Sequence, residues 1–292
     1  IVNVNVATIK GCNFVSNTAK GEESDSNYGG GAISFVGAYS DKKETLTITD
    51  SLFEGNSLDG VGGGAIYARA STVNVASSAF IVNVDDSGYA IYSRVTSMVT
   101  PAVTANDNWW GLSESPKDYV SSKVTLNRWA VLTVSNDTAF VEGENVTITA
   151  DINSYTTGTT SGKLTNPINV AREVTIETST GDINGVLENG EFSTVYNVPE
   201  GLKYVDAVVD SQRENLYLVS TGTIQINNIT VKKAERPTYV INVTCPDGTI
   251  VNQGTVELFI NDESIAVVDV EEGTTSARFV ISLDSGKYDI VA

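Results

Sequence analysis

An internal repeat constrains the fold of this chain more than any other feature. Each copy has the pattern Phe-x-x-Asn followed by a glycine-led Ala-Ile. The three copies are Phe14 to Asn17 with 29–33, Phe53 to Asn56 with 62–66, and Phe80 to Asn83 with 88–91. A unit of this size cannot bury its apolar face alone, so it stacks on copies of itself. The phenylalanines are 39 and 27 residues apart, which favours short strands joined by loops of variable length.

The residues before each phenylalanine alternate as in a strand with one buried face. Apolar side chains stand five positions earlier, at Ile9, Ile48 and Val75, between small or polar neighbours. Stacked copies would place Phe on Phe and Ile on Val. We expect the asparagines to turn the chain through local backbone bonds and left-handed geometry, and the glycines to permit bends. Residues 1 to about 108 are therefore predicted to be the last coils of a right-handed parallel β-helix.

Two groups of surface proteins have similar motifs. Gly-Gly-Ala-Ile paired with Phe-x-x-Asn is similar to the repeat of the chlamydial polymorphic membrane proteins. The run Asn-Asp-Asn-Trp-Trp-Gly at 106–111, followed by Ser-Pro at 115–116 and the segment 127–134, resembles a junction in adhesin-like surface proteins of methanogenic archaea. There a β-helix closes on Asn-x-Trp-Trp-Gly and immunoglobulin-like repeats follow. The resemblance covers essentially the whole chain, and it implies a fold and a cell-surface role without catalytic residues.

The chain beyond Trp129 consists of short alternating strands separated by Gly, Asn and Pro. Six or seven strands over about a hundred residues, the last at 224–227, are typical of an immunoglobulin-like β-sandwich. We therefore expect an all-β protein with three domains. They are β-helix coils with a Trp-Trp-Gly capping segment at 1–128, a sandwich at 129–235, and a second, incomplete sandwich at 236–292.

The formal net charge of −18 limits the partners, because nucleic acid and anionic membranes attract positive surfaces. Two cysteines, Cys12 and Cys245, lie in different segments, which excludes a disulfide framework. The sequence has neither a signal peptide nor a long apolar run. It begins inside a repeat, so we expect export and anchoring signals to lie outside it.

The absence of histidine removes Ser-His-Asp triads, Cys-His pairs and histidine metal sites. Carboxylate chemistry stays open, because many β-helices resemble pectate lyases, polygalacturonases or tailspike glycosidases. Asp85 and Asp86 are adjacent, however, so a strand would point them to opposite faces. No neighbouring copy repeats them at the separation that glycoside hydrolysis needs. We predict a non-catalytic protein, with a polysaccharide lyase or glycosidase as the alternative.

The strand alternation predicts one binding surface. If the isoleucines of the second and third copies point inward, four side chains point outward: Tyr67, Arg69, Tyr92 and Arg94. Coils about 4.8 Å apart would form an aromatic platform with two guanidinium groups, suited to a sugar ring and its carboxylate or sulfate. The first copy has Ser34 and Val36 instead. The alternative is structural, because tyrosine ladders stabilise stacked strands and Asp85 or Asp86 would satisfy the arginines.

Trp109 and Trp110 follow the predicted coils, where a solenoid needs a cap. We expect them to plug the open end, one facing inward and the other packing on the sandwich side near Trp129. Carbohydrate binding is the alternative, but large aromatic side chains are usually buried.

Asn-x-Ser/Thr sequons predict glycosylation of an exported protein at Asn136, Asn145, Asn228 and Asn242. Acidic turns at 262–263 and 271–272 offer weak calcium sites at most, because no spaced loop of oxygen ligands is present. No cofactor and no resident metal are expected.

These observations predict an extracellular, adhesin-like cell-surface protein that attaches to a partner-cell surface protein or glycan. It would act together with further domains of the same protein and without membrane insertion in this segment. A stalk or cell-wall spacer, with the adhesive site elsewhere, is the alternative among non-enzymes.

Overall fold

The structure is a computed structural model of the chain. It describes residues 5–20, 29–37, 44–96, 101–112, 114–216, 223–225, 238–244, 255–260, 263–270, 274–278 and 290–291. The fold is all-β as predicted: within these ranges the helical structure is one 3-10 turn, η1 (Pro116–Tyr119). The chain forms two compact units, one of them comprising Ile1–Asp137, Thr147–Tyr196 and Leu202–Tyr217.

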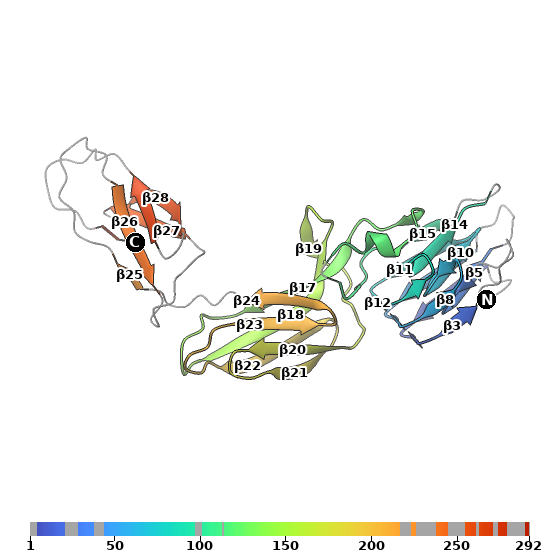
Figure 1. Ribbon diagram of the computed structural model, residues 1–292, viewed down its shortest axis with the longest axis horizontal. Helices are drawn as coiled ribbons and strands as arrows, with labels where there is room; N and C mark the ends of the chain where they lie inside the picture. Colours follow the sequence, from blue (N-terminus) through green and yellow to red (C-terminus); the bar gives the residue numbers. More distant parts are fainter. Residues whose placement is uncertain are drawn as a thin grey trace. The chain divides into compact units, whose positions relative to one another are not determined.

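The first part of this unit is a stack of parallel strands, which we call the coil stack (residues 5–128; Figure 1). One sheet contains β1 (Val6–Lys10), β6 (Thr45–Thr49), β11 (Thr72–Ala76), β15 (Ala102–Thr104) and β16 (Val124–Thr125). Three sheets have three strands each: β5 (Ile33–Val36), β10 (Ile66–Arg69) and β14 (Ile91–Arg94); β2 (Asn13–Val15), β7 (Leu52–Glu54) and β12 (Ala79–Ile81); β3 (Thr18–Lys20), β8 (Ser57–Asp59) and β13 (Val84–Asp85). The short strands β4 (Gly29–Gly30) and β9 (Gly62–Gly63) also pair in parallel.

The register of these sheets aligns the repeat copies residue by residue. Phe53 is the strand partner of both Phe14 and Phe80. Their rings stack with centroids 4.9 and 4.8 Å apart, so the predicted column of phenylalanines is confirmed. The Ala-Ile glycines let the backbone approach itself closely: a Cβ on Gly63 would lie 2.0 Å from the carbonyl oxygen of Ile66.

The repeat asparagines differ in part from the prediction. The left-handed residue is the one before each asparagine, with φ of 54° at Ser16, 63° at Gly55 and 50° at Val82. Asn56 itself is buried, and its Nδ2 donates to the Phe14 carbonyl (2.8 Å) and to Asn83 Oδ1 (2.7 Å). Asn83 Nδ2 likewise donates to the Phe53 carbonyl of the neighbouring coil (2.8 Å), and it also donates within its own turn to the Ile81 carbonyl (3.2 Å). The buried amides therefore join neighbouring coils in addition to bonding locally, as buried polar groups need partners.

The structure adds a fourth copy that the sequence analysis did not identify. Ala105 and Trp110 occupy the positions of the isoleucine and phenylalanine, five residues apart, and both are buried. Asp107 has φ of 62°, like Ser77 (49°) at the same position of the third copy. Trp110 stacks on Phe80 with centroids 4.8 Å apart. The Trp-Trp-Gly segment therefore continues the coil stack.

The second part of the first unit, which we call the first sandwich, contains two sheets. One comprises β17 (Trp129–Asn136), β18 (Asn145–Thr156), β19 (Ser161–Lys163) and β22 (Glu191–Asn197). The other comprises β20 (Arg172–Thr178), β21 (Ile183–Leu187), β23 (Val205–Val209) and β24 (Gln212–Leu216). Alternate side chains such as Ile148 and Ile176 are fully buried, so a core lies between the sheets.

The second compact unit comprises Thr138–Val146, Asn197–Gly201 and Leu218–Ala292. It contains two antiparallel sheets, β25 (Thr223–Gln225) with β26 (Thr238–Thr244) and β29 (Thr274–Arg278), and β28 (Glu263–Asp269) with β27 (Thr255–Ile260) and β30 (Ile290–Val291). The sequence analysis assigned the strand at 224–227 to the first sandwich. This assignment is wrong, because β25 pairs with β26. The other domain boundaries stay predictions.

Candidate functional site

The four residues of the predicted binding surface lie together on β10 and β14. Tyr67 is the strand partner of Tyr92, and Arg69 is the partner of Arg94. The two tyrosine rings stack with centroids 6.1 Å apart and planes inclined by 13°. Tyr89 adds a third ring, 5.9 Å from that of Tyr92. Parallel register thus produces the ladder that the alternation predicts.

The predicted open aromatic platform is not formed, and this part of the prediction is corrected by the burial of Tyr67. Tyr67 is only 1% exposed, although its neighbour Ile66 is the side chain that points into the coil interior. Tyr92, Arg69 and Arg94 are half-buried. Alternation fixes the side of the sheet on which a residue lies, but it does not determine what covers that side. Of the stacked pair Tyr67 and Tyr92, Tyr92 is the ring that is partly exposed.

Burial raises the pKa of the Tyr67 phenol above its usual value, and a hydrogen bond with Arg94 and the charge of Arg69 offset part of this shift. An unperturbed tyrosine titrates near pH 10, so Tyr67 is neutral at physiological pH. Its chemistry here is hydrogen bonding and stacking rather than proton transfer.

Asp85 has a structural role that the sequence analysis did not anticipate. Its carboxylate is buried and accepts from the backbone N–H groups of Gly62 (2.9 Å), Ser87 (2.9 Å) and Tyr89 (2.7 Å). The carboxylate is thus occupied by backbone donors, and Asp86 is exposed. Pairing of the ladder arginines with Asp85 or Asp86 stays a prediction. The carboxylate ties the turn after β13 to the glycine segment of the neighbouring coil.

The tryptophan pair faces two ways. Trp110 belongs to the coil interior and shares its core with Trp129. Trp109 is fully buried, and its Nε1 donates to Asp210 Oδ2 at 2.6 Å. Asp210 lies in the turn between β23 and β24 of the first sandwich, so the adjacent tryptophans connect the two parts of the unit.

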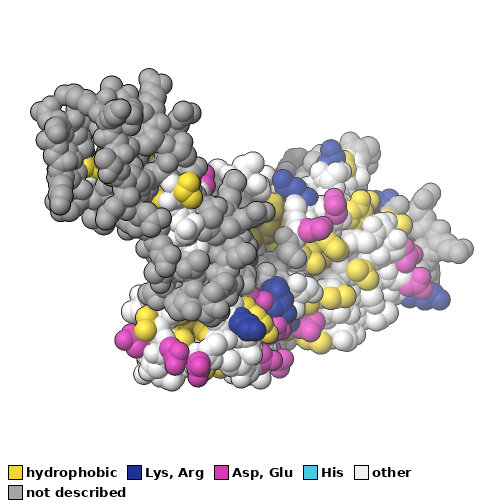
Figure 2. All heavy atoms as spheres, turned by 60° about the vertical axis from the view of Figure 1, so that its left-hand side comes forward, with side chains coloured by type: hydrophobic (Ala, Val, Ile, Leu, Met, Phe, Trp, Pro, Cys, Tyr) yellow, Lys and Arg dark blue, Asp and Glu magenta, His cyan; other side chains and the backbone are white. Residues whose placement is uncertain are grey.

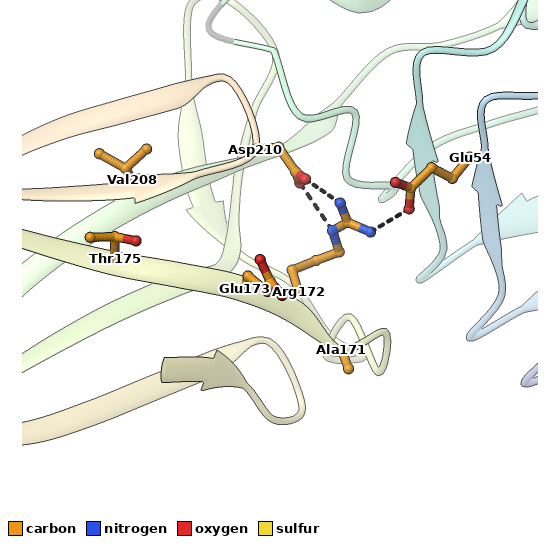
Figure 3. A pocket seen from close by; sticks show the side chains of 7 residues that line it. All are labelled: Glu54, Ala171, Arg172, Glu173, Thr175, Val208 and Asp210. Atoms are coloured by element: carbon orange, nitrogen blue, oxygen red, sulfur yellow. Dashed lines mark hydrogen bonds and ion pairs between the residues drawn. The ribbon is translucent and has the colours of Figure 1, made fainter. Parts of the chain in front are cut away.

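Charged side chains lie around the bond between Trp109 and Asp210. We call the four residues Glu54, Trp109, Arg172 and Asp210 the junction cluster. Arg172 lies between the two carboxylates (Figure 3): its Nη1 donates to Glu54 Oε2 at 2.9 Å, and its Nε and Nη2 donate to Asp210. The side chains of Arg172 and Asp210 are only 12% and 10% exposed. Burial lowers the pKa of Arg172, but the hydrogen bonds to Asp210 and Glu54 outweigh it and raise the pKa above its ordinary value.

A pocket of about 550 Å³ lies beside the junction cluster. Three residues of the cluster line it, together with Ala171, Glu173, Thr175 and Val208 (Figure 3). The sequence analysis missed this cluster. One signal was present: Glu54 stands in register with Val15 and Ile81, so a charge interrupts an apolar column. Nothing local marked Arg172, which is 118 residues away from Glu54.

The predicted glycosylation sites lie partly within the described residues. Asn136, Asn145 and Asn242 are exposed, and Asn145 Oδ1 accepts from Asn197 Nδ2 at 3.0 Å. Asn228 and the acidic turn at 271–272 lie outside the described residues, as does Asp262. Among the residues that are described, no group of three or more acidic, cysteine or histidine side chains is arranged to hold a metal ion.

Acidic side chains occur at several places on the described surface (Figure 2), as expected from the net charge of −18. In the described ranges, no helix has the length and apolar character needed to span a membrane.

No protein-family model and no curated protein matches the chain. A search of solved structures found a chain described as "Ca2+-stabilized adhesin helps an Antarctic bacterium reach out and bind ice". The alignment covers 57% of the present chain and 48% of that chain, at 18% identity and a TM-score of 0.18. The present chain thus spans about half the length of that adhesin, and the TM-score is too low to indicate a shared overall fold.

Proposed function

We propose that the chain is part of a non-catalytic, adhesin-like cell-surface protein. In this proposal the coil stack is the end of a right-handed parallel β-helix and immunoglobulin-like sandwiches follow it. The molecule is extracellular, needs no cofactor, and presents a surface to a partner-cell protein or glycan. The more specific likeness to methanogen surface proteins, and glycosylation at the sequons, are part of the same proposal.

One observation carries this proposal: the stack of coils ends in a segment that bonds directly to the first sandwich. The ring column runs from Phe14 to Trp110, and Trp109 of the same segment bonds to Asp210 of the sandwich. A repeat scaffold bonded directly to a sandwich is suited to holding a surface away from its anchor. Such a scaffold supports display better than it supports catalysis.

The Tyr92 and Arg94 edge of the ladder is the surface that supports attachment best. It combines a partly exposed aromatic ring with a half-buried guanidinium, a pairing that binds sugar rings and their acidic substituents. The lyase or glycosidase alternative has less support, because Asp85 already accepts three backbone hydrogen bonds.

A printed array of glycans and microbial surface material tests the proposal. Binding of the protein and loss of printed material are both measured. The variant is Tyr92→Ser, because Ser34 occupies the corresponding position of the first copy in the same register. Tyr204→Ser, which changes a tyrosine that is 43% exposed on the first sandwich, is the matched control.

We expect binding that Tyr92→Ser abolishes and Tyr204→Ser preserves. Equal loss in both variants would remove recognition from the ladder. Disappearance of printed glycan would contradict the non-catalytic assignment. Absence of binding on every spot would contradict attachment by this segment and favour the stalk alternative.

A further inference from the structure

We infer that the junction cluster is a latch that makes the coil stack and the first sandwich open and unfold as one unit. The inference concerns how the molecule transmits load, and it stands apart from what the surface binds. Two of its bonds cross from one part to the other: Arg172 Nη1 to Glu54 Oε2 at 2.9 Å, and Trp109 Nε1 to Asp210 Oδ2 at 2.6 Å.

Burial makes these bonds consequential. Trp109 is fully buried, and the side chain of Arg172 is 12% exposed. If the sandwich separated from the coils, the Trp109 indole N–H and the Nη1 group of Arg172 would lose their carboxylate partners. Hydrogen bonds to charged groups contribute more than neutral ones, and breaking a buried pair is more costly than breaking an exposed one.

The surrounding backbone fits the same role. Asp210 has φ of 52°, and its turn packs on Gly111, where an added Cβ would lie 3.1 Å from Asp210 Cβ. Ser211 N donates to the Gly111 carbonyl at 3.3 Å, and Gln212 Nε2 donates to the Leu112 carbonyl. The turn that carries Asp210 is thus held directly against the segment that follows the tryptophans.

The first sandwich contains a matched ion-pair triad that does not cross to the coils. Arg213 pairs with Asp206 and Glu177, each at 2.6 Å. This triad has the same chemistry, one arginine and two carboxylates, but its arginine side chain is 51% exposed. Removing Arg213 therefore shows the effect of losing an ion pair without losing a bond between the coil stack and the first sandwich.

Hydrogen exchange measured by mass spectrometry at increasing urea concentrations tests the latch. In the wild type, we expect slow amides of β12 in the coils and β20 in the sandwich to show the same urea dependence, as in one cooperative unit. Glu54→Val removes one crossing bond and places in the second copy the type of residue found at Val15. We expect β20 to exchange roughly tenfold faster than β12 in this variant.

Arg213→Met is the control and should leave β12 and β20 coupled. Trp109→Phe, which removes the other crossing bond, should separate the two strands as Glu54→Val does. The latch is contradicted if the strands already differ in the wild type. It is also contradicted if both latch variants leave them coupled, or if Arg213→Met separates them equally. Should Glu54→Val fail to fold, Glu54→Gln provides a milder loss of the same charge.

Discussion

Trp110 lies on Phe80 with ring planes inclined by 21° and centroids 4.8 Å apart, the same spacing that joins Phe80 to Phe53. The tryptophan is therefore the fourth ring of the interior column. Its Nε1 is buried and has no hydrogen-bond partner within the described part of the chain. The adjacent Trp109 bonds to Asp210 instead.

Trp110→Phe should change the free energy of unfolding by less than about 1.5 kcal/mol. The substitution restores the ring type of the column and removes an unsatisfied buried donor, which by itself costs about 1–3 kcal/mol. Trp109→Phe should cost more, about 1.5–3 kcal/mol, because it removes a bond to a carboxylate. Urea denaturation of both variants measures the difference, and a larger loss for Trp110→Phe would refute this account.

Val82→Gly should stabilise the protein by about 0.5–1 kcal/mol. Val82 has φ of 50°, a left-handed conformation that costs an L-residue about 1–2 kcal/mol. Glycine adopts this conformation without that cost, but it loses more conformational entropy on folding, which offsets part of the stabilisation. Little burial is lost, because the side chain is 76% exposed. Thermal unfolding measures the effect. Val84→Gly, in a strand with ordinary backbone angles, is the control and should destabilise.

Asn56→Ala should destabilise the coil stack by roughly 3 kcal/mol. The fully buried amide donates to Phe14 and Asn83 and accepts from Asn17, so alanine leaves several buried groups unpaired. Asn17→Ala should cost less, because Asn17 is exposed. Chemical denaturation of the two variants gives the comparison. Equal losses would show that the asparagine hydrogen bonds contribute no more to stability inside the coil stack than at its edge.

Stability should fall at alkaline pH because of Tyr67. Its pKa in the folded state is raised, chiefly by burial, so the folded protein keeps the phenol proton longer than the unfolded chain does. The contribution is fully present below about pH 10, the unfolded value, and is lost as pH rises through the folded pKa.

Urea denaturation across this pH range measures that loss, and ultraviolet absorbance follows the ionisation. Tyr67→Phe should remove a phenol whose pKa is raised in the folded state and so reduce the alkaline dependence. An unchanged titration in this variant would show that another tyrosine is responsible.

Sequence reasoning was most reliable where structure follows from the repeat. The alignment of Phe14, Phe53 and Phe80 and the pairing of Tyr67 with Tyr92 are both observed. These relationships depend on two short-range rules, the two-residue period of a strand and the stacking of like on like. The fourth copy escaped recognition because tryptophan replaces phenylalanine and the asparagine that follows is absent.

The burial of individual side chains and the contacts between distant residues could be found only in the folded structure. The composition and repeats alone determined an all-β protein with stacked coils and a neutral ring column inside it. Only the tertiary structure showed that Tyr67 is covered and that Arg172 meets Glu54 across 118 residues. The physical reason is that strand period and repeat register act between neighbours along the chain or along the stack. How separate sheets pack together decides which surface is covered. The same packing decides which distant charge pairs with a carboxylate such as that of Glu54.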